Sequence, residues 1–188
     1  DTTAVRQNGD INATRLEANL NGVVKSGQWH FKVYNYNSER GVPGAIVNNV
    51  WRRGERIWDT NSFVQVNYTQ TFGKFTTLNN LKYAFYRTHY VNNDDKQIKI
   101  DNLYKQKEVY FSSANEYVLF PWWHVSAAYD FQWNTLDADV YGFAQPDRFS
   151  NMLSVATAFD LGRLKAQASV LATFIHDSLK GQQSPSDK

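Results

Sequence analysis

The sequence has no cysteine among its 188 residues, which excludes disulfide scaffolds and cysteine-based metal or redox sites. It also lacks a marked excess of charge, since 20 basic and 18 acidic residues leave a net charge of +2. No basic face stands out, so we expect no nucleic-acid partner. The G-x-S-x-G, phosphate-loop and dinucleotide motifs are absent as well, and nothing else indicates a catalytic site.

Long hydrophobic runs are missing too. No stretch approaches the roughly 18 consecutive apolar residues of a transmembrane helix. This excludes a helical membrane span but not a membrane, because a transmembrane β-barrel needs apolar residues only at alternate positions. The chain begins at Asp1 without an initiator methionine or a signal sequence, and we interpret it as a mature form or an excised piece.

What the sequence does contain is a period-two alternation of apolar and polar residues, which is typical of strands with two different faces. Eight runs carry it, most of them much longer than the usual ~5–6 residues of a soluble strand. They lie at about 11–24, 28–38, 59–72, 75–87, 104–119, 123–134, 149–159 and 164–176. We therefore expect an all-β chain, an antiparallel up-and-down meander of about eight long strands.

The fifth run, 104–119, fits this pattern least well. Val109 and Phe111 share one parity, but Lys105 and Lys107 share it with them. A β-bulge that switches parity would reconcile the two pairs. The eighth run also contains residues that favour helices, and its strict alternation nevertheless favours a strand.

The links between the runs alternate in length. Short links at 25–27, 73–74, 120–122 and 161–163 are separated by long ones at 39–58, 88–103 and 135–148. Membrane barrels have short periplasmic turns and long extracellular loops, whereas a soluble meander has no reason to sort its links in this way. The sequence therefore predicts a segment of a larger transmembrane barrel.

Aromatic residues lie near the strand ends, where rings favour the headgroup region of a bilayer. The candidate membrane-interface residues are Trp29, Phe72, Phe75, Trp122, Trp123 and Trp133. The alternative is that these rings form the core of a β-sandwich, although sandwich aromatics need not cluster at strand ends. The opposite, polar face would line the lumen and contains Glu17, Asn19, Lys32, Gln65, Asn67, Lys82, Asp130, Gln132, Lys165 and Gln167.

The direction of the strands suggests that residues 1–188 are one partial barrel domain. The first and last runs both have their outer ends on the long-link side, whereas a complete bacterial barrel keeps both termini on the short-turn side. The ends of the chain would then be halves of two further long loops, and the terminal aromatic strand end of complete outer-membrane proteins is missing.

A short stretch of sequence resembles a known family. Glu39-Arg40-Gly41-Val42-Pro43-Gly44-Ala45-Ile46-Val47 follows a strand that ends in Tyr34-Asn35-Tyr36. This resembles the RG-x-PG loop of TonB-dependent outer-membrane receptors, and 58–65, 82–86 and 131–134 are similar to the same family. The resemblance implies a barrel of about 22 strands with a plug domain and energy-coupled import through the TonB system. Vitamin B12 receptors are the nearest type, followed by siderophore receptors.

The resulting hypothesis is a segment of a receptor in the bacterial outer membrane that imports a bulky nutrient such as a corrinoid or siderophore. Its partners would be outer-membrane lipid, the plug domain, the rest of the barrel and the TonB system. We expect no enzymatic activity, no cofactor and no metal site. Trp51, Arg52 and Arg53 are weak candidates for ligand contact, although ordinary loop charge explains them as well. The alternatives are a small complete outer-membrane barrel with a structural or adhesive role, and a soluble β-sandwich binding module.

Overall fold

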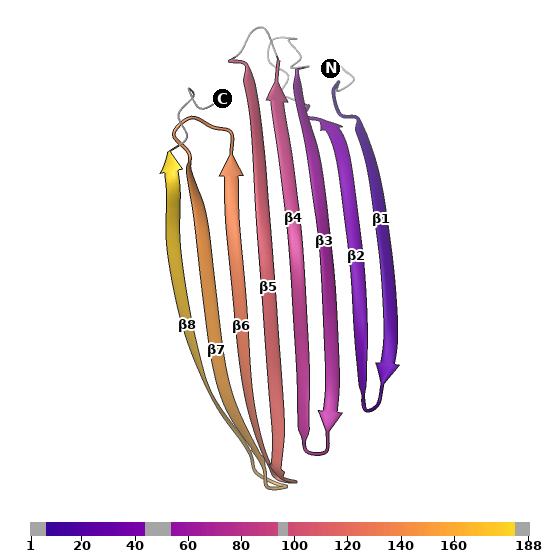
Figure 1. The fold of residues 1–188 in the computed structure, drawn as a ribbon, viewed down its shortest axis with the longest axis vertical. Coiled ribbons are helices and arrows are strands. Elements are labelled where there is room, and N and C mark those ends of the chain that lie inside the picture. The colour runs from indigo at the N-terminus through magenta and orange to yellow at the C-terminus, as the bar shows by residue number, and fades with distance from the viewer. Residues whose placement is uncertain (1–6, 44–53, 94–97, 183–188) are drawn as a thin grey trace, which may run out of the picture.

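The computed structural model describes residues 7–43, 54–93 and 98–182. These residues form eight β-strands that run alternately up and down (Figure 1). The strands are β1 (Ile11–Val24), β2 (Gly27–Gly41), β3 (Glu55–Phe72), β4 (Phe75–Asn92), β5 (Ile100–Phe120), β6 (Trp123–Ala138), β7 (Ala144–Asp160) and β8 (Lys165–Gln182). In this part of the chain no helix is long and apolar enough to cross a membrane.

All eight strands belong to one sheet, in which each strand pairs antiparallel with the next. This confirms the predicted all-β meander. The described residues do not form the two packed sheets that a β-sandwich requires. The strand order also ends at β1 on one side and β8 on the other, and these two edges make no contact with each other within the described ranges.

The links are sorted by length onto the two ends of the sheet, as the sequence predicts. Figure 1 shows the tight turns at the lower end of the sheet, whereas the start of β1, the end of β8 and the strand ends that the longer links join lie at the upper end. At the β3–β4 turn Gly73 has a φ of 59°. Gly73 is the first residue of this two-residue turn. A type II′ hairpin turn needs a positive φ at its first residue, and glycine adopts such a φ without strain.

The strands extend further at the long-link end than predicted. β3 begins at Glu55 rather than near 59, and β5 begins at Ile100 rather than near 104. The parity switch that was offered as one way to reconcile the β5 pattern does not occur, because the pairing of β5 with β6 is regular from Tyr104 to Val118. The irregularity comes only after Val118, beside the Pro121 turn. Lys105 and Lys107 do face the same way as Val109 and Phe111, and they simply lie nearer the long-link end.

Two different faces follow from this regular register, because directly paired residues project to the same side of a sheet. One face, here called the apolar face, contains Leu20, Phe31, Val66, Leu81, Phe111, Phe131, Leu153 and Val170 with their same-parity neighbours. The other, the polar face, contains all ten residues predicted for it, from Glu17 and Asn19 through Lys82 to Gln167. In Figure 1 the lower ends of β7 and β8 recede from the viewer, so the sheet is curled.

The sheet has almost no protein core. Ala84 and Ala138 are the only buried hydrophobic residues in the described ranges, whereas Leu20, Val155 and Phe174 are 60%, 50% and 65% exposed. A soluble single-layer sheet would have to cover its apolar side with a second layer. Nothing in the described part of the chain does so.

Candidate functional site

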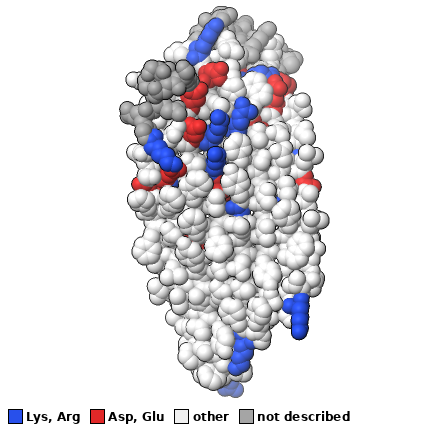
Figure 2. Space-filling view, viewed as in Figure 1, with Lys and Arg blue, Asp and Glu red and all other residues white. Residues whose placement is uncertain are grey.

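Charged residues are excluded from the apolar face over most of its height. We followed the apolar-face residues of each strand, from β1 to β8, starting at the short-turn end. The first charged residue met on this face is Asp10 (just before β1), Glu39, Arg56, Arg87, Lys107, Asp137, Asp147 and Lys180, respectively. All eight therefore lie toward the long links. Figure 2 shows the same division, with acidic and basic side chains gathered at the upper end, an almost uncharged middle and only basic residues at the lower end.

Aromatic rings border this uncharged region. At the short-turn end the Trp122 and Trp123 rings stack with Phe120 and Phe159, and the Trp123–Phe159 ring centroids are 5.4 Å apart. At the other border Trp133 stacks with Phe149 at 6.5 Å. Trp29, Phe72 and Phe75, which were predicted as interface residues, occupy the apolar face near the short turns.

On the polar face, charged residues are paired rather than isolated. The Glu17 carboxylate contacts the Lys32 ammonium at 2.8 Å and the Arg15 guanidinium at 2.5 Å. The Asn19 amide donates a further hydrogen bond to Glu17 at 3.2 Å and lies 3.1 Å from the His30 ring. These contacts connect β1 to β2 across the polar face.

A second group of paired charges lies between β4 and β6. The Lys82 ammonium contacts the Glu108 carboxylate at 3.0 Å and the Tyr86 hydroxyl at 3.4 Å. On the neighbouring strands the Tyr110 hydroxyl donates to Asp130 at 3.0 Å. Lys82 and Glu108 are only 25% and 15% exposed, so this pair is more shielded than Lys32 and Glu17, which are each 25% exposed.

Two aromatic rings join these groups. Tyr34 and Phe63 stack with centroids 4.9 Å apart, and the Lys32 and Lys82 ammonium groups lie 5.8 and 5.6 Å from the Phe63 ring. Cations at this distance are attracted by the ring quadrupole. Ala84 is fully buried beside Phe63, so a small residue makes room for the rings. Both rings share the parity of the polar residues on their strands, and sequence reasoning missed the cluster because a single sequence does not show that Tyr34 lies against Phe63.

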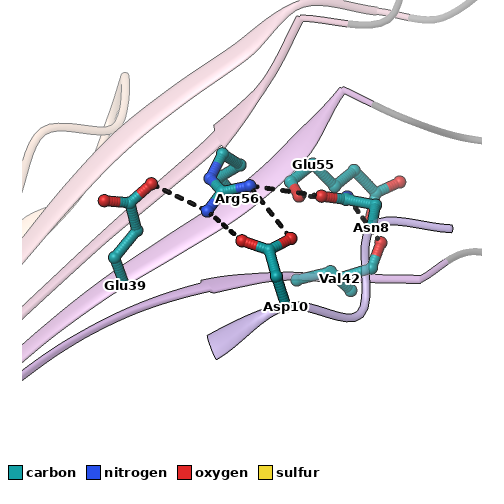
Figure 3. Close-up of polar contacts among 6 residues, drawn as sticks. All are labelled: Asn8, Asp10, Glu39, Val42, Glu55 and Arg56. Carbon is teal, nitrogen blue, oxygen red and sulfur yellow. Dashed lines mark hydrogen bonds and ion pairs between the residues drawn. The ribbon is translucent and has the colours of Figure 1, made fainter. Parts of the chain in front are cut away.

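A separate cluster lies at the long-link end (Figure 3). Arg56 contacts Asp10 at 2.8 Å and Glu39 at 2.7 Å. The Asn8 amide donates to the backbone carbonyls of Val42 at 3.2 Å and Glu55 at 2.7 Å. The cluster fastens the segment before β1 to the ends of β2 and β3. The hydrogen bond from Arg56 holds the pKa of the Asp10 carboxyl below its usual value.

Trp51, Arg52 and Arg53, the weak candidates for ligand contact, lie outside the described residues. Within the described ranges no three His, Cys, Asp or Glu side chains come together as a metal site. His89 lies 2.6 Å from Asp101 and His124 lies 2.9 Å from Glu116, while the His30 ring lies between the Asn19 and Asn67 side chains.

The chain matches no family model, and no curated protein matches it.

The shielded pair Lys82–Glu108 gives a first prediction. Lys82→Met leaves the Glu108 carboxylate without its cation, and we expect it to lower the free energy of unfolding by about 1–3 kcal/mol. Adding Glu108→Gln should recover part of the loss. Arg148→Met is the control, since Arg148 and Asp177 are 56% and 50% exposed and such pairs contribute less than about 1 kcal/mol. Urea titrations measure all four proteins, and equal losses in Lys82→Met and Arg148→Met would contradict the prediction.

The Asp10–Arg56 contact predicts a pH dependence at the long-link end. Because the folded pKa of Asp10 lies below the unfolded value of about 3.9, the contact stabilises the folded chain above that pH. Its contribution is lost as the pH falls through the lowered pKa. A carboxyl NMR titration should give a midpoint below about 3.9 in the parent protein and a higher one in Arg56→Gln. An identical midpoint in both proteins would show that Arg56 does not act on Asp10.

Proposed function

We propose that this chain is part of the wall of a bacterial outer-membrane β-barrel, with its apolar face toward lipid. The observation that carries the proposal is a region of the apolar face without charged residues, which is bordered by aromatic rings and not covered by any described residue. On β6 the border residues Trp123 and Trp133 are ten residues apart. That is about 33 Å along the strand at ~3.3 Å per residue, or about 25 Å of bilayer for a strand tilted by ~40°.

The sorted links support an orientation. Barrel proteins place short turns in the periplasm and long loops outside the cell. The tight turns would therefore be periplasmic, and the long links with the Arg56 cluster would be extracellular. The charged residues of the apolar face all lie toward that outer side, beyond the hydrocarbon.

The two open edges favour a larger barrel over a closed barrel of eight strands. In the described residues β1 and β8 each pair on one side only. An unpaired backbone group in hydrocarbon costs several kcal/mol, so an edge inside a bilayer must be continued by further strands. The pairing of β1 with β8 that a small closed barrel would need is not found among these residues.

The polar face would then line the lumen. The similarity of residues 39–47 to TonB-dependent receptors supports import of a bulky nutrient, such as a corrinoid or siderophore, as the activity of the whole barrel. A plug domain and the TonB system would be its partners, and this chain would contribute wall and extracellular loops rather than a catalytic group.

Two arginine substitutions on adjacent residues of β7 test the placement in lipid. Leu153 lies on the apolar face between the Phe149 and Phe159 rings, and Ser154 lies on the polar face. We expect Leu153→Arg to cost about 2–4 kcal/mol in lipid vesicles, the effect of a cation near the bilayer centre. Ser154→Arg should cost less than about 1 kcal/mol because its guanidinium can reach water.

The measurement is urea unfolding of both variants in lipid vesicles. Leu153 is 47% exposed, so in a protein surrounded by water an arginine at this position should be close to neutral. Equal stability of the two variants would therefore contradict the proposed lipid contact.

Import is tested separately, with the intact protein in cells. Cells that produce it should accumulate a labelled corrinoid or a ferric siderophore faster than cells that lack it, and an uncoupler of the inner-membrane proton gradient should abolish the difference. Equal accumulation of both nutrients in the two strains, or uptake that the uncoupler does not change, would contradict the receptor hypothesis without affecting the membrane placement.

A further inference from the structure

Asn151 and Thr157 are single polar residues on the apolar face of β7, whereas β3, β4 and β5 carry a larger polar patch on that face. The patch consists of Gln70, Thr77, Asn79, Ser113 and Asn115. The register makes it continuous, because Thr77 pairs with both Gln70 and Asn115, and Asn79 pairs with Ser113. Five polar side chains therefore adjoin one another on a face that is otherwise mainly aliphatic and aromatic.

The patch lies inside the apolar face rather than at its border. Toward the short turns it is followed by Phe72, Phe75 and Tyr117, and toward the long links by Leu81 and Phe111. Asn79 is four residues from Phe75 along β4. With a rise of ~3.3 Å per residue and a strand tilt of ~40°, its amide lies about 10 Å above the lower ring border.

Hydrogen bonds within the patch satisfy it only in part. The Asn79 amide donates to the Thr77 hydroxyl at 2.9 Å, and the Asn115 amide donates to the Ser113 hydroxyl at 3.1 Å. Each bond uses one of the four that an asparagine side chain can form. Lipid tails offer no partner for the rest, and polar groups left in hydrocarbon are costly.

We propose that the polar patch is a contact surface for a second copy of this chain within the membrane. The proposal rests on the proposed placement of the apolar face in lipid. Amides and hydroxyls both donate and accept, so the patch can pair with itself across a two-fold axis. If that axis is parallel to the membrane normal, the second patch lies at the same depth by symmetry. A different protein would need polar side chains on its own lipid-facing surface at the same depth in the membrane.

Single cysteines provide the test, since the chain has none of its own. The variants are Asn79→Cys and Asn115→Cys, with Leu153→Cys as the control. Successive cross-strand pairs connect Asn79 with Ser113, Ser113 with Tyr129 and Tyr129 with Leu153. Leu153 therefore lies level with Asn79 across the strands, but on the other half of the sheet. The intact protein is treated in its native membrane with a mild oxidant and, separately, with a short bifunctional thiol reagent. We expect a covalent dimer several-fold more abundant for positions 79 and 115 than for position 153.

Labelling of the cysteines with a membrane-impermeant maleimide distinguishes failure of the lipid placement from failure of the contact proposal. If positions 79 and 153 both react fully, the lipid placement itself is wrong. If position 79 alone reacts, the patch lies in water and the contact proposal is overturned. If both are protected and dimers are absent, or equally abundant for all three variants, only the contact proposal fails. Cross-linking of position 79 to a different protein would also overturn the second copy as the occupant.

Discussion

The register of the strand pairs is the constraint on which both faces of this molecule depend. Side chains alternate with a period of two, so pairing in register places every residue of one parity on the same side of the sheet. A slip by one residue between β4 and β5 would move Glu108 to the apolar face and expose Phe111 on the polar one. The tight turns at 25–26, 73–74 and 121–122 fix the register from one end.

The two faces differ in what this single layer can supply. The polar face satisfies its charges internally, through Glu17 with Lys32, Lys82 with Glu108, and the Phe63 ring beside both lysines. The apolar face cannot do the same, because aliphatic side chains are stabilised only by removal from water. In the proposed membrane placement, lipid would remove them from water without a second protein layer. The thin sheet would then keep its polar side open to a lumen.

Much of this arrangement could be predicted from the sequence, because alternation, link length and ring position are local patterns. The eight strands, their single antiparallel order and the membership of the two faces were all predictable. The pattern fails where the surroundings of the strand change. Lys105 and Lys107 suggested a bulge because charged and apolar residues were expected on opposite faces along the whole strand. In the structure, charged residues also occupy the apolar face beyond the ring border.

Contacts between distant segments were not predictable. The stacking of Tyr34 on Phe63 needs β2 and β3 in a particular register, and the Asn8 and Asp10 contacts with Arg56 join residues more than 40 positions apart. Nothing in a single sequence shows such pairs. The loop residues Trp51, Arg52 and Arg53 stay predictions, because they lie outside the described residues.

The most direct test of the membrane placement is the depth of the tryptophan rings in a bilayer. The protein is folded into vesicles whose lipids carry bromine either near the headgroup or near the end of the acyl chain, and tryptophan fluorescence is recorded. With Trp29, Trp123 and Trp133 at the borders of the apolar face, shallow bromines should quench most strongly and terminal bromines less, in accordance with interfacial rings. Fluorescence that is unchanged by bromine at either depth would contradict the account.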